Sequence, residues 1–355
     1  MAKKRILFLG ETYRADAITW MNGLKEFGDF EIVTWELKSS SNGINRIKRL
    51  FELASAILSI KSIVKKFNAD MVIAERTTSY GFLAALTGIK PIAIAQQGIT
   101  DLWPSKSILF IFKKMLQDYA FKKADLIHAW GNVMAQHMKE SNVDMSKVMI
   151  LPKGINLDFF EFMNSSDEKF INAIVTRSLQ PEYNHSIIFK AFSIIKQKEI
   201  PFKLTIIGDG IELQRLKTLA KELNIENEVV FVGRVDNKDI PKYLQKSNFY
   251  ISMPITEGVS SSLFEAMACG SFPIVSDLPG NSCWITQKVN GILVSSKNEF
   301  KLAEEIEWAY KNSDVTNIAI IENRKLVVEN ANYKINMKKI AVAYHDLITI
   351  KSTTT

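Results

Sequence analysis

The sequence predicts an α/β protein made of two doubly wound domains, each with a parallel sheet covered by helices on both faces. The chain has 355 residues, which suits two domains of roughly 100–200 residues each. Short apolar runs alternate with helix-length amphipathic segments, as in repeated strand–helix units. These apolar runs form two series of six. Strands are expected at 6–9, 31–35, 71–74, 92–95, 126–129 and 148–151, and then at 173–176, 203–207, 229–232, 249–251, 272–275 and 292–294.

Helical patterns fill the intervals between these strands. The clearest cover residues 44–67 and 108–122, and a last one covers residues 336–350. In open parallel sheets, ligands bind beyond the carboxyl ends of the strands, so a site is expected at that edge. The expected divisions are an N-terminal domain, a C-terminal domain and a final segment that packs back on the N-terminal domain, at 1–155, 156–335 and 336–355.

Composition is that of an ordinary globular protein, because 47% of the residues are hydrophobic and 23% are charged. There are two cysteines, Cys269 and Cys283, which argues against a disulfide framework and for a reducing compartment. No apolar run reaches the length of about 18 residues that spans a bilayer. The first apolar run stops at Gly10 and Glu11, so we interpret it as a buried strand rather than a signal peptide. A cytoplasmic location is therefore expected.

The net charge of +7 is unevenly distributed. Residues 1–155 hold 22 Lys and Arg against 14 Asp and Glu, whereas the rest of the chain holds 23 against 24. An anionic membrane surface, a phosphorylated acceptor or nucleic acid would fit the basic half, and so would a solvated surface without a partner. Residues 44–67 and 106–123 mix basic and apolar side chains. Such segments can lie on the inner face of a cell membrane, although core-facing helices of this fold look similar.

Two glutamates eight residues apart, Glu257 and Glu265, carry the most specific chemical signal. Between them lies a serine-rich stretch that opens a short helix of small residues ending at Gly270. A helix start presents unpaired backbone N–H groups, which suit an anion such as a diphosphate. Glu265, about one turn into the helix, could accept hydrogen bonds from sugar hydroxyls, and Glu257 could face the group that the diphosphate carries. The pattern indicates a nucleotide-sugar site.

Further segments of the C-terminal half occur in a specific order. They are 151–156, Arg177 with Pro181 and Glu182, 207–210, 230–235, the two-glutamate motif, 278–281 and 290–294. In this order they resemble the retaining glycosyltransferases of family four, over about residues 120–300. The resemblance implies the GT-B architecture, in which two Rossmann-like domains face each other across a cleft.

The resemblance assigns roles to the donor half. It implies that Glu265 binds the ribose of the nucleotide and that Glu257 lies beside the transferred sugar and its departing phosphate. Arg177 is matched to an arginine on the diphosphate, a catalytic role for a cation where negative charge develops. A surface charge, a charge favourable to the helix dipole and a surface ion pair are the structural alternatives for these three residues. The backbone from Ser260 to Leu263, including Ser261 and Ser262, would hold the diphosphate, while serine there is also an ordinary helix cap.

Other donor-site residues are less specific. Gly208 lies at a strand-to-helix turn near the nucleotide, although glycine at such a turn is often conformational. Arg234 and Val235 are similar to residues that line the base pocket of the family. Many relatives place a lysine and a glycine after the arginine, where this chain has Tyr183 and Asn184. That pair resembles a subgroup linked to surface polysaccharide synthesis, with Asn184 near the donor. It removes one phosphate-binding charge, for which Lys153 or Arg14 are candidate replacements.

The N-terminal half offers an acceptor or cleft site. Gly10, Glu11 and Thr12 follow the first strand, where the family has a glycine-containing loop. Gln97 stands where many relatives carry a histidine before a glycine, so it can hydrogen-bond an acceptor hydroxyl but cannot act as a base. Asp101 is the nearer candidate for a base, and equally a cap of the next segment.

These features predict a retaining hexosyl- or N-acetylhexosaminyltransferase. The expected donor is a nucleoside diphosphate sugar, most simply a UDP-sugar, and the acceptor is a hydroxyl of a glycan or lipid-linked glycan in surface polysaccharide synthesis. We expect no metal and no other cofactor, because no metal-ligand cluster is evident. We also expect no nucleic-acid partner. A non-catalytic GT-B subunit that retains the nucleotide site and a nucleotide-sugar epimerase are the alternatives.

Overall fold

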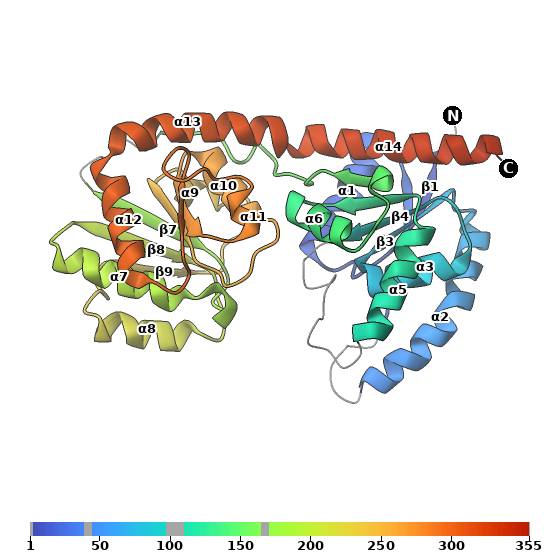
Figure 1. Cartoon of the computed structure of the whole chain (residues 1–355), viewed down its shortest axis with the longest axis horizontal. Helices are drawn as coiled ribbons and strands as arrows, with labels where there is room; N and C mark the ends of the chain where they lie inside the picture. Colours follow the sequence, from blue (N-terminus) through green and yellow to red (C-terminus); the bar gives the residue numbers. More distant parts are fainter. Residues whose placement is uncertain (1–2, 39–44, 97–109, 165–169, 355) are drawn as a thin grey trace. The chain divides into compact units, whose positions relative to one another are not determined.

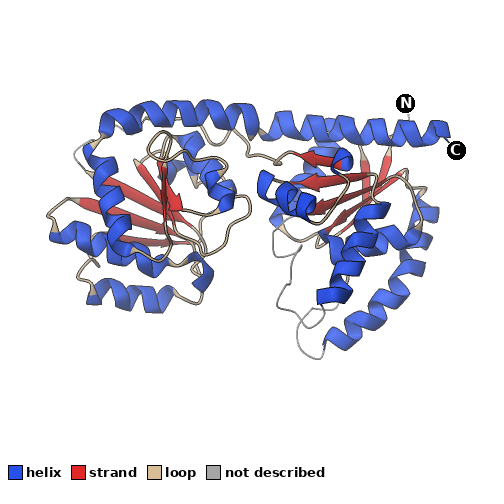
Figure 2. Cartoon of the chain, in the orientation of Figure 1, coloured by secondary structure: helices blue, strands red, loops and turns tan. Residues whose placement is uncertain are grey.

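The computed structural model describes residues 3–38, 45–96, 110–164 and 170–354. These residues divide into two compact units. The N-terminal unit comprises residues 1–153 together with 334–355, and the C-terminal unit comprises residues 154–333. Each unit holds a sheet of six parallel strands with helices on both faces (Figures 1 and 2). The prediction of two doubly wound α/β domains is therefore confirmed.

The first sheet has the strand order β2-β1-β3-β4-β5-β6. Its order reverses between β1 and β3, because the chain moves outward to β2 and then returns to the other side of β1. The strands are β1 (Arg5–Leu9), β2 (Glu31–Trp35), β3 (Met71–Glu75), β4 (Ile92–Gln96), β5 (Leu126–Ala129) and β6 (Val148–Ile150).

The helices of the N-terminal unit cover this sheet, and a π-helical turn, η1 (Arg76–Gly81), follows β3 directly. The last helix, α14, belongs to this unit: the Tyr344 hydroxyl lies 2.7 Å from His128 Nε2, and His345 stacks on Phe30. The α-helices are α1 (Ala15–Gly28), α2 (Asn45–Phe67), α3 (Phe82–Thr87), α5 (Phe110–Lys123), α6 (Asn132–Glu140) and α14 (Tyr333–Thr354).

The second sheet has the strand order β12-β11-β10-β7-β8-β9, and its order reverses between β7 and β10. All its strand pairs are parallel. The strands are β7 (Ile171–Thr176), β8 (Phe202–Ile207), β9 (Val229–Gly233), β10 (Phe249–Ser252), β11 (Phe272–Ser276) and β12 (Ile292–Val294).

Two apolar layers cover the second sheet, because alternate strand residues point to opposite faces. Ala173 and Val175 of β7 belong to the layer with α7, α8 and α12, whereas Ile174 belongs to the layer with α9 and α10. The α-helices are α7 (His185–Gln197), α8 (Leu213–Glu222), α9 (Pro241–Leu244), α10 (Ser261–Cys269), α11 (Pro279–Ser282), α12 (Glu299–Lys311) and α13 (Ser313–Asn330).

All twelve expected strands are present, with ends that differ from the expected ones by at most two residues. The three helices expected at 44–67, 108–122 and 336–350 are observed as α2, α5 and α14. Among the described helices, none combines the length and the apolarity that crossing a bilayer requires.

Candidate functional site

The reversal of strand order between β7 and β10 places two polar side chains next to each other in the C-terminal unit. Arg177 follows β7, and Ser252 is the last residue of β10. Because these strands are parallel neighbours, both residues lie at the carboxyl edge of the sheet, and Arg177 Nε donates to Ser252 Oγ at 3.3 Å. Such an edge, where strand order reverses, is the usual ligand position in open α/β sheets.

The Arg177 guanidinium joins the two halves of the serine-rich motif. Its Nη2 donates to the carboxylate of Glu257 and to the hydroxyl of Ser260. The side chain is 14% exposed, and its guanidinium lies 5.3 Å from the centre of the Tyr183 ring. Burial lowers the pKa of Arg177, but electrostatic interactions with Tyr250, Glu257 and Tyr183 raise it by more than burial lowers it. The pKa of Arg177 is therefore above its ordinary value. Arg177 is therefore a fixed positive charge at this edge.

Helix α10 begins at the same point. Ser260 caps it, since its hydroxyl accepts a hydrogen bond from the backbone N–H of Leu263 at 3.3 Å. Among the described residues, the backbone N–H groups of Ser261 and Ser262 have no acceptor, as expected for a helix start. The interpretation of Ser260 as a cap is confirmed, and the unpaired N–H groups are compatible with the predicted diphosphate contact.

Glu265 is buried in the first turns of α10, with 9% of its surface exposed. Burial raises the pKa of its carboxyl group to about 7, while the positive charge of Arg177 lowers it in part. The interpretation as a surface charge is wrong for this residue, because the side chain lies within the core of the unit. A buried carboxyl group costs free energy unless a partner compensates it, which is typical of functional positions.

Two glycines allow the loops of this edge to approach closely. Gly208 has a φ of +144°, and a Cβ atom there would lie 2.2 Å from the carbonyl oxygen of Arg177. A Cβ atom on Gly280 would lie 2.6 Å from the carbonyl oxygens of Glu257 and Gly258. Gly208 is therefore required sterically, and it supports the backbone that presents Arg177.

The turn after Arg177 carries no second cation. Asn184 is left-handed, with a φ of 52°, and its side-chain Nδ2 donates to the carbonyl oxygen of Ser296 at 2.8 Å. The next residue is His185, and burial is the main cause that lowers the pKa of its imidazole to about 4. His185 is therefore neutral at physiological pH, and it does not replace the lysine that many family members have here.

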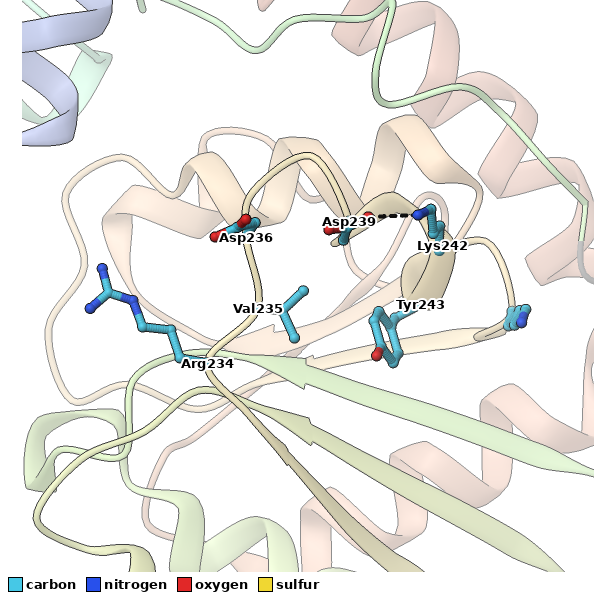
Figure 3. A pocket seen from close by; sticks show the side chains of 7 residues that line it. Arg234, Val235, Asp236, Asp239, Lys242 and Tyr243 are labelled. Atoms are coloured by element: carbon cyan, nitrogen blue, oxygen red, sulfur yellow. Dashed lines mark hydrogen bonds and ion pairs between the residues drawn. The ribbon is translucent and has the colours of Figure 1, made fainter.

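A pocket of about 620 Å³ opens beyond β9 (Figure 3). Arg234 and Val235 line it, together with the ion pair between Lys242 Nζ and Asp239 Oδ1 at 2.6 Å and the ring of Tyr243. The pocket has charged and aromatic walls, which suit a polar ring such as a nucleobase.

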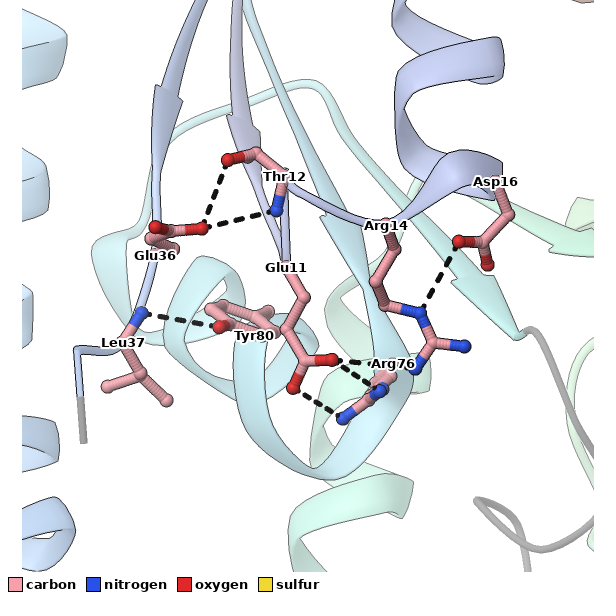
Figure 4. Close-up of polar contacts among 8 residues, drawn as sticks. All are labelled: Glu11, Thr12, Arg14, Asp16, Glu36, Leu37, Arg76 and Tyr80. Carbon is pink, nitrogen blue, oxygen red and sulfur yellow. Dashed lines mark hydrogen bonds and ion pairs between the residues drawn. The ribbon is translucent and has the colours of Figure 1, made fainter. Parts of the chain in front are cut away.

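The N-terminal unit has a polar cluster where its own strand order reverses, between β1 and β3 (Figure 4). Arg76 follows β3 and donates from Nη1 and Nη2 to the two carboxylate oxygens of Glu11, at 2.9 and 2.7 Å. The backbone N–H and the hydroxyl of Thr12 both donate to Glu36 Oε2, at 3.2 and 3.0 Å. A Cβ atom on Gly10 would lie 2.7 Å from a carboxylate oxygen of Glu75. The structure thus holds the Gly10–Thr12 loop firmly.

Arg14 and Lys153 belong to this N-terminal cluster. Arg14 Nε lies 3.4 Å from Asp16 Oδ1, and its Nη1 lies 3.5 Å from Glu11 Oε2. Lys153 Nζ donates to the carbonyl oxygen of Asp16 at 2.9 Å and lies 5.1 Å from the Trp130 ring. Burial lowers the pKa of Lys153, and Asp16 opposes that shift. Both cations are thus engaged with acidic or carbonyl partners.

Two residues with predicted roles, Gln97 and Asp101, lie outside the described residues. Ser252 and Arg76 were not predicted from the sequence. Each becomes recognisable once strand order shows which loops are neighbours, since a polar residue at the end of a strand has no special pattern by itself. Within the described ranges, no three His, Cys, Asp or Glu side chains gather as a metal-ligand set.

Two family models match the chain. Residues 158–331 match the glycosyl transferases group 1, and residues 5–130 match the glycosyl transferase 4-like family.

Proteins with similar sequences are also glycosyltransferases. The chain is 25% identical over 317 residues (84% of this chain and 85% of the relative) to the N-acetylgalactosamine-N,N'-diacetylbacillosaminyl-diphospho-undecaprenol 4-alpha-N-acetylgalactosaminyltransferase of Campylobacter jejuni. It is 25% identical over 315 residues (83% and 80%) to the Escherichia coli UDP-Gal:alpha-D-GlcNAc-diphosphoundecaprenol alpha-1,3-galactosyltransferase. It is also 26% identical over 247 residues to an uncharacterised glycosyltransferase of Methanocaldococcus jannaschii, covering 67% of this chain and 63% of that relative's length.

A solved structure with the same fold is that of Anabaena HepE in complex with UDP. The TM-score is 0.79 at 14% sequence identity, over 98% of this chain and 100% of that one. The fold is therefore GT-B. The chain belongs to the glycosyltransferases that combine a 4-like N-terminal domain with a group 1 C-terminal domain.

Proposed function

We propose that the protein transfers a sugar from a UDP-sugar to a hydroxyl group of a lipid-linked glycan, with retention of anomeric configuration. One observation carries the proposal: the buried cation Arg177 contacts both Glu257 and the cap of α10, next to unpaired helix N–H groups and the buried carboxyl of Glu265. A fixed positive charge, a helix start and a carboxyl within one unit match a diphosphate attached to a ribose.

Each part of the donor has a proposed place in the C-terminal unit. The diphosphate lies on Arg177 and on the backbone of Ser261 and Ser262. The ribose hydroxyls donate to Glu265, which compensates its buried carboxyl group. The base enters the pocket beside Arg234 and Val235, with Gly208 and Asn184 shaping the adjoining loops. When the diphosphate binds the guanidinium of Arg177 in place of Glu257, the Glu257 carboxylate is released and faces the transferred sugar.

In the proposed reaction, one bond to the anomeric carbon breaks and one new bond to it forms. The bond to the departing phosphate oxygen breaks, and the acceptor oxygen bonds to the same face of the sugar. The acceptor hydroxyl proton goes to the departing phosphate, so the charges balance. Arg177 and the α10 N–H groups stabilise the negative charge on that phosphate, and these contacts strengthen as the charge develops. Because these groups supply the neutralisation, we propose that transfer needs no metal.

The acceptor and the setting rest on the relatives. Two of them are named for acceptors carried on diphosphoundecaprenol, and one of these for a UDP-galactose donor. We therefore propose hexosyl or N-acetylhexosaminyl transfer in surface polysaccharide synthesis, in the cytoplasm at the inner face of the membrane. The basic N-terminal unit would contact the anionic surface, and its Gly10, Glu11 and Thr12 loop would border the acceptor. Gln97 and Asp101 stay candidates for the acceptor side.

Release of UDP from UDP-glucose, UDP-galactose and their N-acetylated forms tests this proposal directly. We expect Arg177→Ala to lower turnover by about 10²–10³, as for the loss of a charge-stabilising group, and Glu257→Gln to lower it strongly. Glu322→Gln is the matched control, because Glu322 forms an exposed ion pair with Lys325 on α13 of the same unit. Wild-type turnover in both Arg177→Ala and Glu257→Gln would show that the site is misassigned.

A further inference from the structure

Helix α5 of the N-terminal unit exposes a dense group of large apolar side chains. Ile111, Phe112, Met115 and Tyr119 are 76%, 57%, 64% and 37% exposed. These four residues define what we call the α5 face. They recur at helical spacing, so they share one side of the helix, whereas Gln117, Ala120 and Phe121 are buried on the other side. An exposed apolar group of this kind is characteristic of an interaction surface.

Lysines border the α5 face at its C-terminal end, while Lys114 pairs with Asp118 at 2.8 Å. The helix contains Lys113, Lys114, Lys122 and Lys123, and Asp118 is its one acidic residue. Lys122 and Lys123 lie three and four positions after Tyr119, so they extend the same side of the helix by one turn. Lys123 Nζ lies 5.8 Å from the centre of the Tyr119 ring. Apolar side chains bordered by lysines complement an anionic lipid surface, in which the chains enter the acyl boundary and the ammonium groups meet the headgroups.

The other described helices of the N-terminal unit fit this role less well. On α2, Leu58 is exposed at 76%, without another exposed large apolar residue among those whose side chains are described. On α14, Ile335, Val342 and Ile350 are exposed but are spread over four turns. The α5 face gathers four such residues within nine positions. Binding to a membrane surface strengthens with the apolar area that one helix face can bury, which favours α5.

We infer that the α5 face is the membrane-docking surface of this glycosyltransferase, with its apolar side chains inserted into an anionic bilayer. The inference rests on the proposed function in that a lipid-linked acceptor gives the contact its purpose. It goes beyond that function by naming one helix and by requiring insertion of side chains. Attraction between the bilayer and the basic unit as a whole would be insensitive to Ile111 and Met115, whereas insertion makes both of them essential.

Flotation of the full-length protein with lipid vesicles tests the inference. We expect binding to vesicles of phosphatidylcholine mixed with phosphatidylglycerol, and much weaker binding to phosphatidylcholine alone. The double variant Ile111→Ser/Met115→Ser should lower the partition coefficient on the order of tenfold. Lys122→Gln/Lys123→Gln should lower it by about 25-fold, since each lysine near an anionic surface strengthens binding about fivefold.

Val342→Ser on α14 is the matched control, because Val342 is 59% exposed in the same unit and should leave flotation unchanged. Equal flotation of wild type and both α5 variants, or no flotation of the wild type, would overturn the inference. So would light scattering that shows a wild-type dimer and a monomeric Ile111→Ser/Met115→Ser variant, because the face would then contact a second copy.

The melting temperature with and without UDP, measured on the same samples, separates this inference from the proposed function. UDP should raise it equally in wild type and in the α5 variants, which also shows that the variants are folded. Stabilisation by UDP without any vesicle binding would overturn the membrane surface alone. Vesicle binding without stabilisation by UDP would overturn the donor site and leave the membrane surface standing.

Discussion

Each unit places an arginine–glutamate pair where the order of its strands reverses, and the two pairs have different surroundings. In the N-terminal unit, Arg76 after β3 binds Glu11 after β1. In the C-terminal unit, Arg177 after β7 binds Glu257 after β10. The side chains are 25% and 17% exposed in the first pair and 14% and 11% exposed in the second. The same topology thus brings one arginine and one glutamate together in each unit.

The surroundings decide what each pair can do. Glu11 also faces Arg14, and Arg76 has a left-handed φ of 63° at the start of a π-helical turn. Such irregular backbone persists where the surrounding structure fixes it, so the first pair tethers two loops to each other. Arg177 instead faces a helix start and lies near the buried carboxyl of Glu265. We therefore propose charge stabilisation for the second pair and loop fixation for the first.

The largest expected difference between the two regions is in their response to pH, because Glu265 is buried with a pKa raised from 4.5 to about 7. In the folded state the Glu265 carboxyl group therefore keeps its proton to a higher pH than it does in the unfolded state. The contribution of Glu265 to the free energy of unfolding therefore declines by about 3 kcal/mol as the pH rises from 4.5 to 7.

Urea unfolding of wild type and Glu265→Gln measures this contribution, since glutamine does not titrate. Relative to the variant, the wild type should lose about 3 kcal/mol in free energy of unfolding between pH 4.5 and a pH above 7. Parallel pH profiles for the two proteins would mean that Glu265 is not desolvated, and the contrast between the two regions would weaken.

A smaller effect separates helix capping from ligand binding. Ser260→Ala and Asn298→Ala each remove a side-chain cap, from α10 and α12 of the same unit. Both should lower the free energy of unfolding by about 1 kcal/mol. UDP affinity should fall in Ser260→Ala alone, because only Ser260 also contacts Arg177. If Asn298→Ala weakens UDP binding to the same extent, the effect is one of general stability.

The sequence was sufficient for the strands but not for the contacts between loops. Alternating apolar runs located all twelve strands, because a buried parallel strand needs a short continuous apolar segment. The order of the strands depends on long-range pairing, so the bond from Arg177 to Ser252 and the pairing of Arg76 with Glu11 could not be predicted. Gly208 shows the same limit: its role as a required glycine depends on the carbonyl oxygen of Arg177, 31 positions earlier in the chain.

Calorimetric titration of UDP into wild type, Arg177→Ala and Arg76→Ala tests the assignment of the two pairs most directly. Each variant removes the arginine of one pair, so the two are matched in chemistry and differ in unit. We predict that Arg177→Ala weakens UDP binding at least about tenfold, since hydrogen bonds to a charged group contribute about 1.5–3 kcal/mol. Arg76→Ala should bind UDP as the wild type does. Equal weakening in both variants, or undiminished binding in Arg177→Ala, would contradict the assignment of the diphosphate to the C-terminal pair.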